Sequence, residues 1–130
     1  MPRPSVSLSF FKLNVADMGA MLDFYEGVFG FSVTATYDVE DFLEHILALP
    51  GQEAGPSLML VSFKDGRDVS VGPGHGPVGL VTDEIEILHG KVLAAGGKQV
   101  TGVFALDGVK LAIVLDPEGH EIELLQFTAS

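Results

Sequence analysis

The sequence predicts an α+β fold in which two βαβββ modules form one curved assembly of eight strands. Three observations predict this fold. Short runs of alternating apolar and polar residues, typical of strands, recur along the 130 residues. Two stretches have the apolar spacing of helices, and each is followed by glycine. The order of elements in the first half recurs in the second, with a repeat of about 65 residues, which indicates an internal duplication.

The first half begins with alternation over residues 8–15, which predicts a strand. Asp17 follows, and its carboxylate can accept hydrogen bonds from the free backbone N–H groups that begin a helix. Gly30 is expected to end this helix in the left-handed conformation. The helix is predicted from one apolar stripe, made by Met21, Leu22, Tyr25, Val28 and Phe29. Three further strands are predicted over residues 31–37, 42–49 and 57–63.

The second half repeats this order, beginning with a strand over residues 78–81. Asp83 is the expected N-cap of the second helix, with Glu86 three residues later as in a capping box. The apolar stripe of this helix contains Ile85, Leu88, Val92 and Ala95, and the helix ends before Gly96 and Gly97. Strands are expected over residues 99–104, 109–115 and 121–127.

The two halves are predicted to form a single domain over residues 1–130. Its modules are residues 8–63 and 77–127, and residues 64–76, rich in Gly, Asp and Pro, connect them. Neither module could bury its sheet alone, which argues against two independent domains. One face of each sheet is expected to pack on its helix, and the two other faces are expected to enclose a groove. Ligand sites are usually concave and mostly apolar, so this groove is the expected functional site.

Composition restricts the partners. The chain has 18 acidic and 7 basic side chains, a net charge of −11, which argues against nucleic acid or an anionic membrane as a partner. It has no cysteine, which excludes disulfides, thiolate metal sites and cysteine nucleophiles. No run of 18 apolar residues and no apolar signal core occurs, so a cytoplasmic protein is expected.

Two motifs carry a family resemblance. The first is NVAD at residues 14–17 with DFYEGVFGF at residues 23–31, and the second is DPEGHEIEL at residues 116–124. With these motifs the chain resembles the vicinal oxygen chelate superfamily, which includes glyoxalase I, extradiol dioxygenases, fosfomycin- and bleomycin-resistance proteins and methylmalonyl-CoA epimerase. The resemblance covers nearly the whole chain and implies a glyoxalase-like half-barrel and a homodimer. Both motifs are structural, a helix with its exit turn and a hairpin turn, so they leave the reaction open.

The resemblance also implies a divalent metal, held by His and carboxylate side chains and open to two oxygens of the substrate. The four family positions fall, in chain order, on Phe10, on Met59 or Leu60, on Pro77 and on Glu123. Of these, only Glu123 is a ligand for a hard cation. We therefore expect no metal cofactor. The alternative is a divalent ion held by His75 and Glu123, with His45 or Glu44 as displaced ligands.

Three residues are candidates for catalysis. Glu123 is expected to face the groove as an acid, base or anchor, since Ile122 and Leu124 take the other face; its plainer interpretation is a half-solvated carboxylate. Lys12 shares the face of Phe10 and would pair with Glu123, bind an anionic group of the substrate, or extend to water. Alternation does not fix the face of the third candidate, His45. The remaining two histidines, His89 and His120, are expected at the surface.

The predicted groove lining is apolar and suits a flat or hydrophobic ligand. It consists of Phe10, Met59 or Leu60, Gly79, Leu111 and Ile113. The leading hypothesis is a protein that holds a small, largely apolar or aromatic molecule without a metal, by sequestering it or by acting on it. The alternatives are a metal-dependent lyase, isomerase or dioxygenase with displaced ligands, and a non-catalytic interaction module whose own side chains fill the groove.

Overall fold

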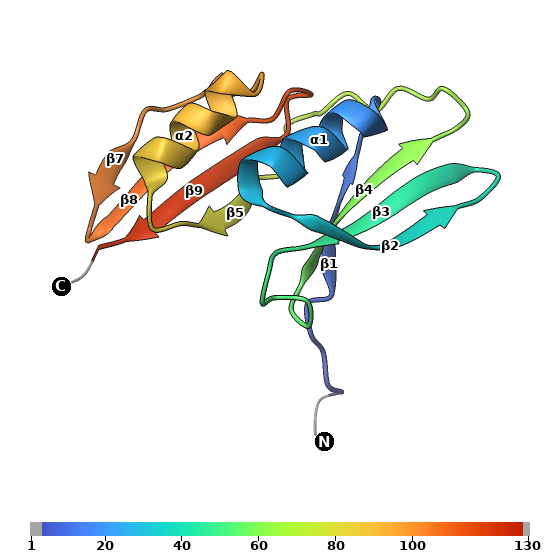
Figure 1. Ribbon diagram of the computed structural model, residues 1–130, viewed down its shortest axis with the longest axis horizontal. Coiled ribbons are helices and arrows are strands. Elements are labelled where there is room, and N and C mark those ends of the chain that lie inside the picture. Colours follow the sequence, from blue (N-terminus) through green and yellow to red (C-terminus); the bar gives the residue numbers. More distant parts are fainter. Residues whose placement is uncertain (1–3, 129–130) are drawn as a thin grey trace.

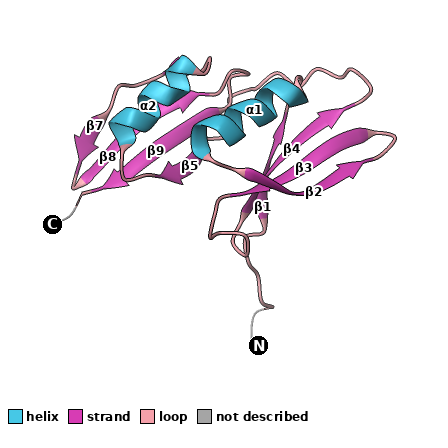
Figure 2. Cartoon of the chain, in the orientation of Figure 1, coloured by secondary structure: helices cyan, strands magenta, loops and turns pink. Residues whose placement is uncertain are grey.

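Each half of the chain forms one sheet that carries one helix. The computed structural model describes residues 4–128, and both helices lie on the same side of the molecule (Figures 1 and 2). The two sheets are separate and are not closed onto each other. Neither helix in this part of the chain is long and apolar enough to cross a membrane.

The first half matches the predicted order closely. Its strands are β1 (Phe10–Asn14), β2 (Ser32–Asp38), β3 (Phe42–Ala48) and β4 (Ser57–Phe63), arranged β1-β4-β3-β2, with α1 at Met18–Phe29. The predicted limits of α1 are confirmed. Asp17 accepts a hydrogen bond from the backbone N–H of Ala20 at 3.1 Å, and Gly30 ends the helix with φ of 82°. Among residues 4–128, β1 pairs only with β4, in parallel, so one edge of β1 has no strand partner in this part of the chain.

The second half differs from prediction at two places. Its elements are β5 (Val78–Val81), α2 (Ile85–Ala94), β6 (Lys98–Gln99), β7 (Phe104–Leu106), β8 (Val109–Leu115) and β9 (Glu121–Phe127). The N-cap of α2 is Glu84, not Asp83. The capping role belongs instead to Gln126 on β9, whose side-chain oxygen accepts from the backbone N–H of Ile85 at 2.9 Å.

The strand predicted over residues 99–104 is interrupted, so the sheet carries β6 and β7 in place of one strand. The backbone N–H groups of Val100 and Thr101 both donate to the carbonyl of Ile113, each at 2.9 Å. The hydroxyl of Thr101 also accepts from the backbone N–H of Ile113 at 2.9 Å. Val100 and Thr101 thus lie opposite the single residue Ile113 on β8, which is the pattern of a β-bulge. The described residues therefore contain nine strands where eight were predicted.

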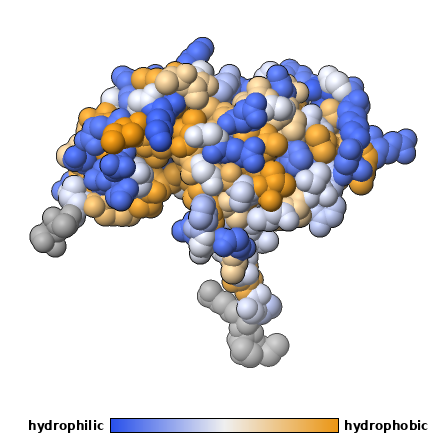
Figure 3. Space-filling view, in the orientation of Figure 1, coloured by the Kyte–Doolittle hydropathy of each residue, from blue (hydrophilic) through white to orange (hydrophobic). Residues whose placement is uncertain are grey.

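The two halves share one hydrophobic core on the helix side of both sheets. Side chains from both halves are fully buried in it: Met21, Tyr25, Leu47, Leu60, Ile85, Val92, Val114, Ile122 and Leu124. The helices α1 and α2 are adjacent. The halves therefore join through their helix sides, and their helix-free faces do not close over a common groove within one chain. Apolar side chains remain visible on both halves of the surface (Figure 3).

Candidate ligand pocket

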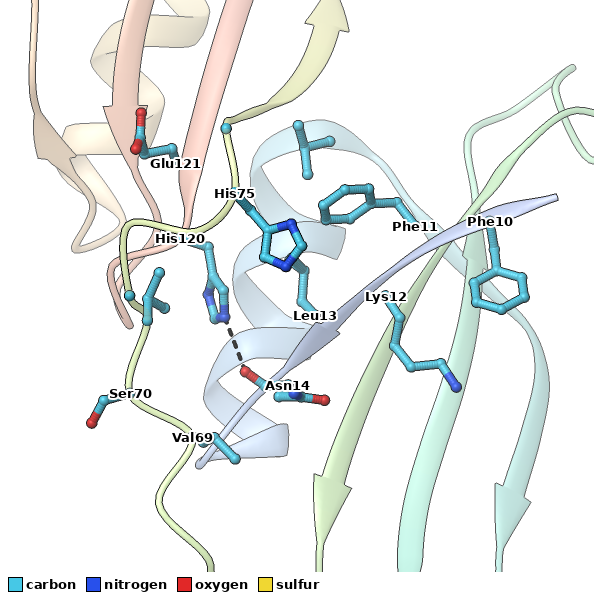
Figure 4. Close-up of a pocket in the computed structure, with 14 residues that line it drawn as sticks. Phe10, Phe11, Lys12, Leu13, Asn14, Val69, Ser70, His75, His120 and Glu121 are labelled. Atoms are coloured by element: carbon cyan, nitrogen blue, oxygen red, sulfur yellow. Dashed lines mark hydrogen bonds between the residues drawn. The ribbon is translucent and has the colours of Figure 1, made fainter. Parts of the chain in front are cut away.

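A pocket of about 380 Å³ lies along the free edge of β1 (Figure 4). The connector that follows β4 forms its opposite wall, and the starts of β5 and β9 close it. Its apolar lining residues are Phe10, Phe11, Leu13, Val69, Val71 and Val78, and its polar ones are Lys12, Asn14, Ser70, His75, His120 and Glu121. An apolar space with a few polar groups is the usual character of a small-molecule site.

The aromatic wall of this pocket comes from two consecutive residues of β1. Alternation puts Phe10 on the helix-free face and Phe11 on the helix side, and both reach the pocket because it runs along the strand edge. Phe11 is 40% exposed and meets His75 edge-to-face, with ring centroids 6.5 Å apart. His75 therefore reaches the site from the connector, which does not continue β5 backwards.

Lys12 pairs with Glu44, a partner that was not among the three alternatives considered from the sequence. Its ammonium nitrogen lies 2.7 Å from Oε1 of Glu44 and 5.3 Å from the centroid of the Phe10 ring. Glu44 is only 8% exposed, so its carboxylate is a buried partner of Lys12. The pairing arises because β4 lies between β1 and β3, an arrangement that alternation within one strand does not reveal.

The turn between β8 and β9 is bonded to the first half of the chain. The hydroxyl of Tyr25 on α1 donates to Oδ2 of Asp116 at 2.7 Å. The Nδ1 atom of His120 lies 2.8 Å from the same oxygen, and its Nε2 atom lies 2.9 Å from the carbonyl oxygen of Asn14. Glu118 accepts from the backbone N–H groups of residues 16 and 17, both at 2.8 Å. The two sequence motifs are therefore in direct contact.

His120 is consequently buried, 8% exposed, and its predicted surface position is wrong. Burial lowers the pKa of His120, but the hydrogen bond and charge of Asp116, with help from Asn14 and Glu118, outweigh that effect and raise the pKa above its ordinary value. Burial, followed by the charge and hydrogen bond of Asp116, also raises the pKa of Tyr25 far above its ordinary value. Sequence reasoning missed this cluster because its members are about 100 residues apart, as His120 and Asn14 are 106 apart.

Of the predicted site residues, only Phe10, Lys12 and His75 line the pocket. Met59 lies beside Lys12 in the sheet register, but Leu60 is fully buried in the core and cannot line a groove. Gly79 and Ile113 flank Glu123 in the second sheet, and these three share its helix-free face with Leu111. The structure thus places the predicted lining in two separate groups.

The remaining histidines lie away from the pocket. His45 pairs with Leu60 in the register and so lies on the helix side of its sheet, where its Nδ1 atom is 2.8 Å from the hydroxyl of Thr36. His89 is half-buried, with Nε2 at 3.3 Å from the carbonyl oxygen of Thr101, so it is less exposed than expected. Neither residue belongs with Glu123 in one catalytic group.

The side chains at the family's ligand positions do not fit a metal ion held by this chain. Phe10, Met59 and Pro77 offer a ring, a thioether and a tertiary amide, none of them a side-chain ligand for a hard cation. Among residues 4–128, no group of three or more His, Cys, Asp or Glu side chains is close enough together to hold a metal. Glu123 is the one family position with a ligating side chain, so the expectation of a metal-free site stays a prediction.

Comparisons with known proteins agree with the fold. The family model described as Glyoxalase/Bleomycin resistance protein/Dioxygenase superfamily matches residues 7–124. A protein from Vibrio parahaemolyticus named "Probable lactoylglutathione lyase" is 27% identical over 119 residues, which cover 88% of this chain and 86% of that protein.

Solved structures show the same architecture. A glyoxalase family protein from Bacillus cereus superposes with a TM-score of 0.85 at 15% identity, covering 98% of this chain and 97% of that one. Glyoxalase I from Zea mays superposes with a TM-score of 0.82 at 20% identity, and the superposition covers 95% of this chain. The chain spans 46% of the maize enzyme, less than half its length. At these identities the structures support the fold alone.

Proposed function

Because this chain belongs to the glyoxalase/bleomycin resistance protein/dioxygenase superfamily, we propose that it binds a small, largely apolar or aromatic molecule beside β1 without a metal. The observation that carries the proposal is the pocket of about 380 Å³, whose aromatic wall includes Phe10, the residue at a family metal-ligand position. Its volume falls within the range of roughly 300–1,000 Å³ that small-molecule sites occupy.

The polar groups of the pocket suit an uncharged ligand that carries a hydrogen-bonding oxygen. The side chains of Asn14 and His75 lie at its wall, and each can donate a hydrogen bond (Figure 4). The hydroxyl of Ser70 donates instead to the Asp68 carboxylate. Lys12 is neutralised by Glu44, and Glu121 adds a further negative charge, so this region does not favour an anion. The overall charge of −11 also supports a small molecule over nucleic acid.

Binding of the neutral fluorescent probe phenylnaphthylamine tests whether the pocket beside β1 holds an aromatic molecule. Replacing the exposed ring of Phe11 by Ala is expected to weaken probe binding about fivefold to tenfold, because one aromatic contact is lost. The matched control is Tyr37→Ala, since Tyr37 is an aromatic residue that is 52% exposed but does not line the pocket. A thermal-shift screen of aromatic compounds on the same variants would follow, since a ligand of the native state raises its melting temperature. Equal affinities for both variants would refute the site.

A second candidate is a metal-dependent enzyme of the same superfamily. The relative named "Probable lactoylglutathione lyase" and the carboxylate of Glu123 favour it. The test is elemental analysis of protein purified without added metal or a histidine tag, followed by an assay for conversion of lactoylglutathione. A stoichiometric transition metal that is lost in the Glu123→Gln variant, together with turnover, would replace the first proposal.

We also propose that a second copy of the chain covers the open apolar face of the second sheet. Four residues on this face are strongly exposed in the single chain: Val81 (66%), Phe104 (43%), Leu106 (59%) and Phe127 (64%). A contiguous apolar surface of this kind is usually an interface. A homodimer would bring Glu123, on the same face, under the cover of the partner.

A further inference from the structure

The ring of His120 lies between two groups that only accept hydrogen bonds. Its Nδ1 atom is 2.8 Å from the Asp116 carboxylate, and its Nε2 atom is 2.9 Å from the backbone carbonyl of Asn14. A neutral imidazole carries one N–H, and its other nitrogen presents a lone pair. A neutral His120 would therefore point a lone pair at an oxygen in a site that is 8% exposed. The imidazolium satisfies both contacts.

The other contacts of Asp116 support this assignment. Its Oδ2 atom accepts from the hydroxyl of Tyr25, and its Oδ1 atom accepts from the backbone N–H groups of Glu118 and His120. Each of its oxygens already faces donors, so Asp116 is an ionised acceptor and Nδ1 of His120 must donate. The carbonyl of Asn14 has no proton to give, so Nε2 must donate as well.

The titratable groups around His120 come from the β8–β9 turn, from α1, from β9 and from the connector. Asp116 and Glu118 lie in the β8–β9 turn and carry negative charge, and Tyr25 reaches the cluster from α1. Glu121 and His75 line the same pocket, Glu121 from β9 and His75 from the connector. The nearby charges are thus mainly negative and favour the imidazolium.

We propose that His120, as an imidazolium, is the positioning residue of the ligand pocket, tying the β8–β9 turn to the end of β1 and holding the wall that contains Asn14. The inference rests on the proposed ligand site, since His120 and Asn14 both line that pocket. His120 acts through this wall and not by direct chemistry. Loss of one ring proton breaks one of the two contacts, so the pocket is complete only while His120 is charged.

The sign of the pH effect follows from the geometry and from the direction of the pKa shift. The folded state raises the pKa of His120 above its ordinary value of 6.5. The stabilisation is therefore fully present below that ordinary value and is lost as the pH rises through the folded-state pKa. Ligand affinity should follow the same course.

The experiment measures phenylnaphthylamine binding from about pH 5 to about pH 9, a range in which histidines titrate. The affinity of the wild-type protein for the probe is expected to fall about fivefold as the pH rises through the pKa of His120. A change of this size corresponds to the loss of one buried hydrogen bond. His120→Gln should bind weakly at every pH. His89→Gln, which removes a half-buried histidine outside the pocket, should keep the wild-type profile.

Nitrogen-detected NMR of the histidine rings gives a reading that does not depend on the ligand. Two ring N–H groups at His120 near pH 6, with one lost at the midpoint of the binding profile, are the expected result. If His120→Gln fails to fold, Tyr25→Phe replaces it. That change removes a competing donor from Asp116, strengthens its hold on His120 and should move the midpoint to higher pH.

The outcomes separate the two proposals. Probe binding that does not change while His120 loses a ring proton would overturn the positioning role. A single ring N–H at His120 near pH 6 would also overturn it, as would a shift of the midpoint of the binding profile to lower pH in Tyr25→Phe. A probe that binds no variant at any pH would instead overturn the proposed ligand site, while the NMR result would still decide the protonation of His120.

Discussion

The hydroxyl of Tyr25 reaches Asp116 across a sequence separation of 91 residues, and both residues are almost completely buried. A buried carboxylate costs free energy unless donors satisfy it, and Tyr25 is one of those donors. This single contact joins α1 of the first half to the closing turn of the second. It belongs to the cluster that alternation and spacing could not predict.

Tyr25→Phe is expected to lower the free energy of unfolding by about 1–3 kcal/mol, because Asp116 loses a buried hydrogen bond while the ring stays in place. Urea denaturation at neutral pH is the measurement. Tyr37→Phe is the matched control, since Tyr37 is 52% exposed, and should change stability by less than about 0.5 kcal/mol. Equal effects of the two substitutions would contradict the role given to Tyr25.

Residue-scale prediction succeeded where the partner is close in the sequence and failed where it is distant. The cap of α1 was predictable because Asp17 and Ala20 are three residues apart. The placement of His120 was wrong, and the pair of Lys12 with Glu44 was not foreseen, because these partners come from other strands. A local pattern gives the face of a side chain but not the neighbour that meets it there.

Four strands begin and end at the residues that the sequence predicted, namely β4, β5, β8 and β9. Apolar alternation bounded by turn residues was sufficient for these strands. The β6–β7 segment was mispredicted as one strand that ends at Phe104. In the structure β7 continues to Leu106 and is joined to β8 by a two-residue hairpin turn at Asp107 and Gly108, with φ of 48° and 78°, which the Asp-Gly pair signals. The bulge at Thr101 has no comparable local signal.

The glycines near α2 allow a prediction at the scale of this element. A Cβ atom added at Gly97 would lie 2.5 Å from Cγ1 of Val92 and 2.6 Å from the carbonyl oxygen of Leu115. Gly97→Ala should therefore destabilise the protein by about 2–3 kcal/mol through overpacking.

The control for this substitution lies inside α2. A Cβ atom at Gly90 meets nothing within 4 Å, so Gly90→Ala should stabilise the protein by about 0.5–1 kcal/mol through helix propensity. Chemical denaturation of both variants measures the two effects. A stability for Gly97→Ala equal to that of the wild type would show that α2 and β8 pack less closely than described.

For the molecule as a whole, the α+β fold and the superfamily were predicted, and both are confirmed. The way in which the two modules meet was not predicted correctly. Alternation shows that each sheet has a face without a helix, but it cannot show whether two such faces meet within one chain. Here the modules join through their helix sides, so the predicted lining is divided and the pocket lies beside β1.

The proposed dimer gives the prediction for the whole molecule. Leu106→Asp and Phe127→Asp each place a charge on the open apolar face and are expected to shift the protein from dimer to monomer in light scattering after gel filtration. Ile87→Asp is the control, because Ile87 is 55% exposed on α2 and does not lie on that face. A wild-type chain that stays monomeric at high concentration would exclude the dimer.

The contact between the two motifs has a consequence for how this sequence evolves. The segments by which the family is recognised meet through Tyr25, Asp116 and Glu118. A natural change on one side leaves a buried group on the other without its partner. Tyr25 and Asp116 should therefore covary among homologous sequences, so that lineages that lose one have also replaced the other.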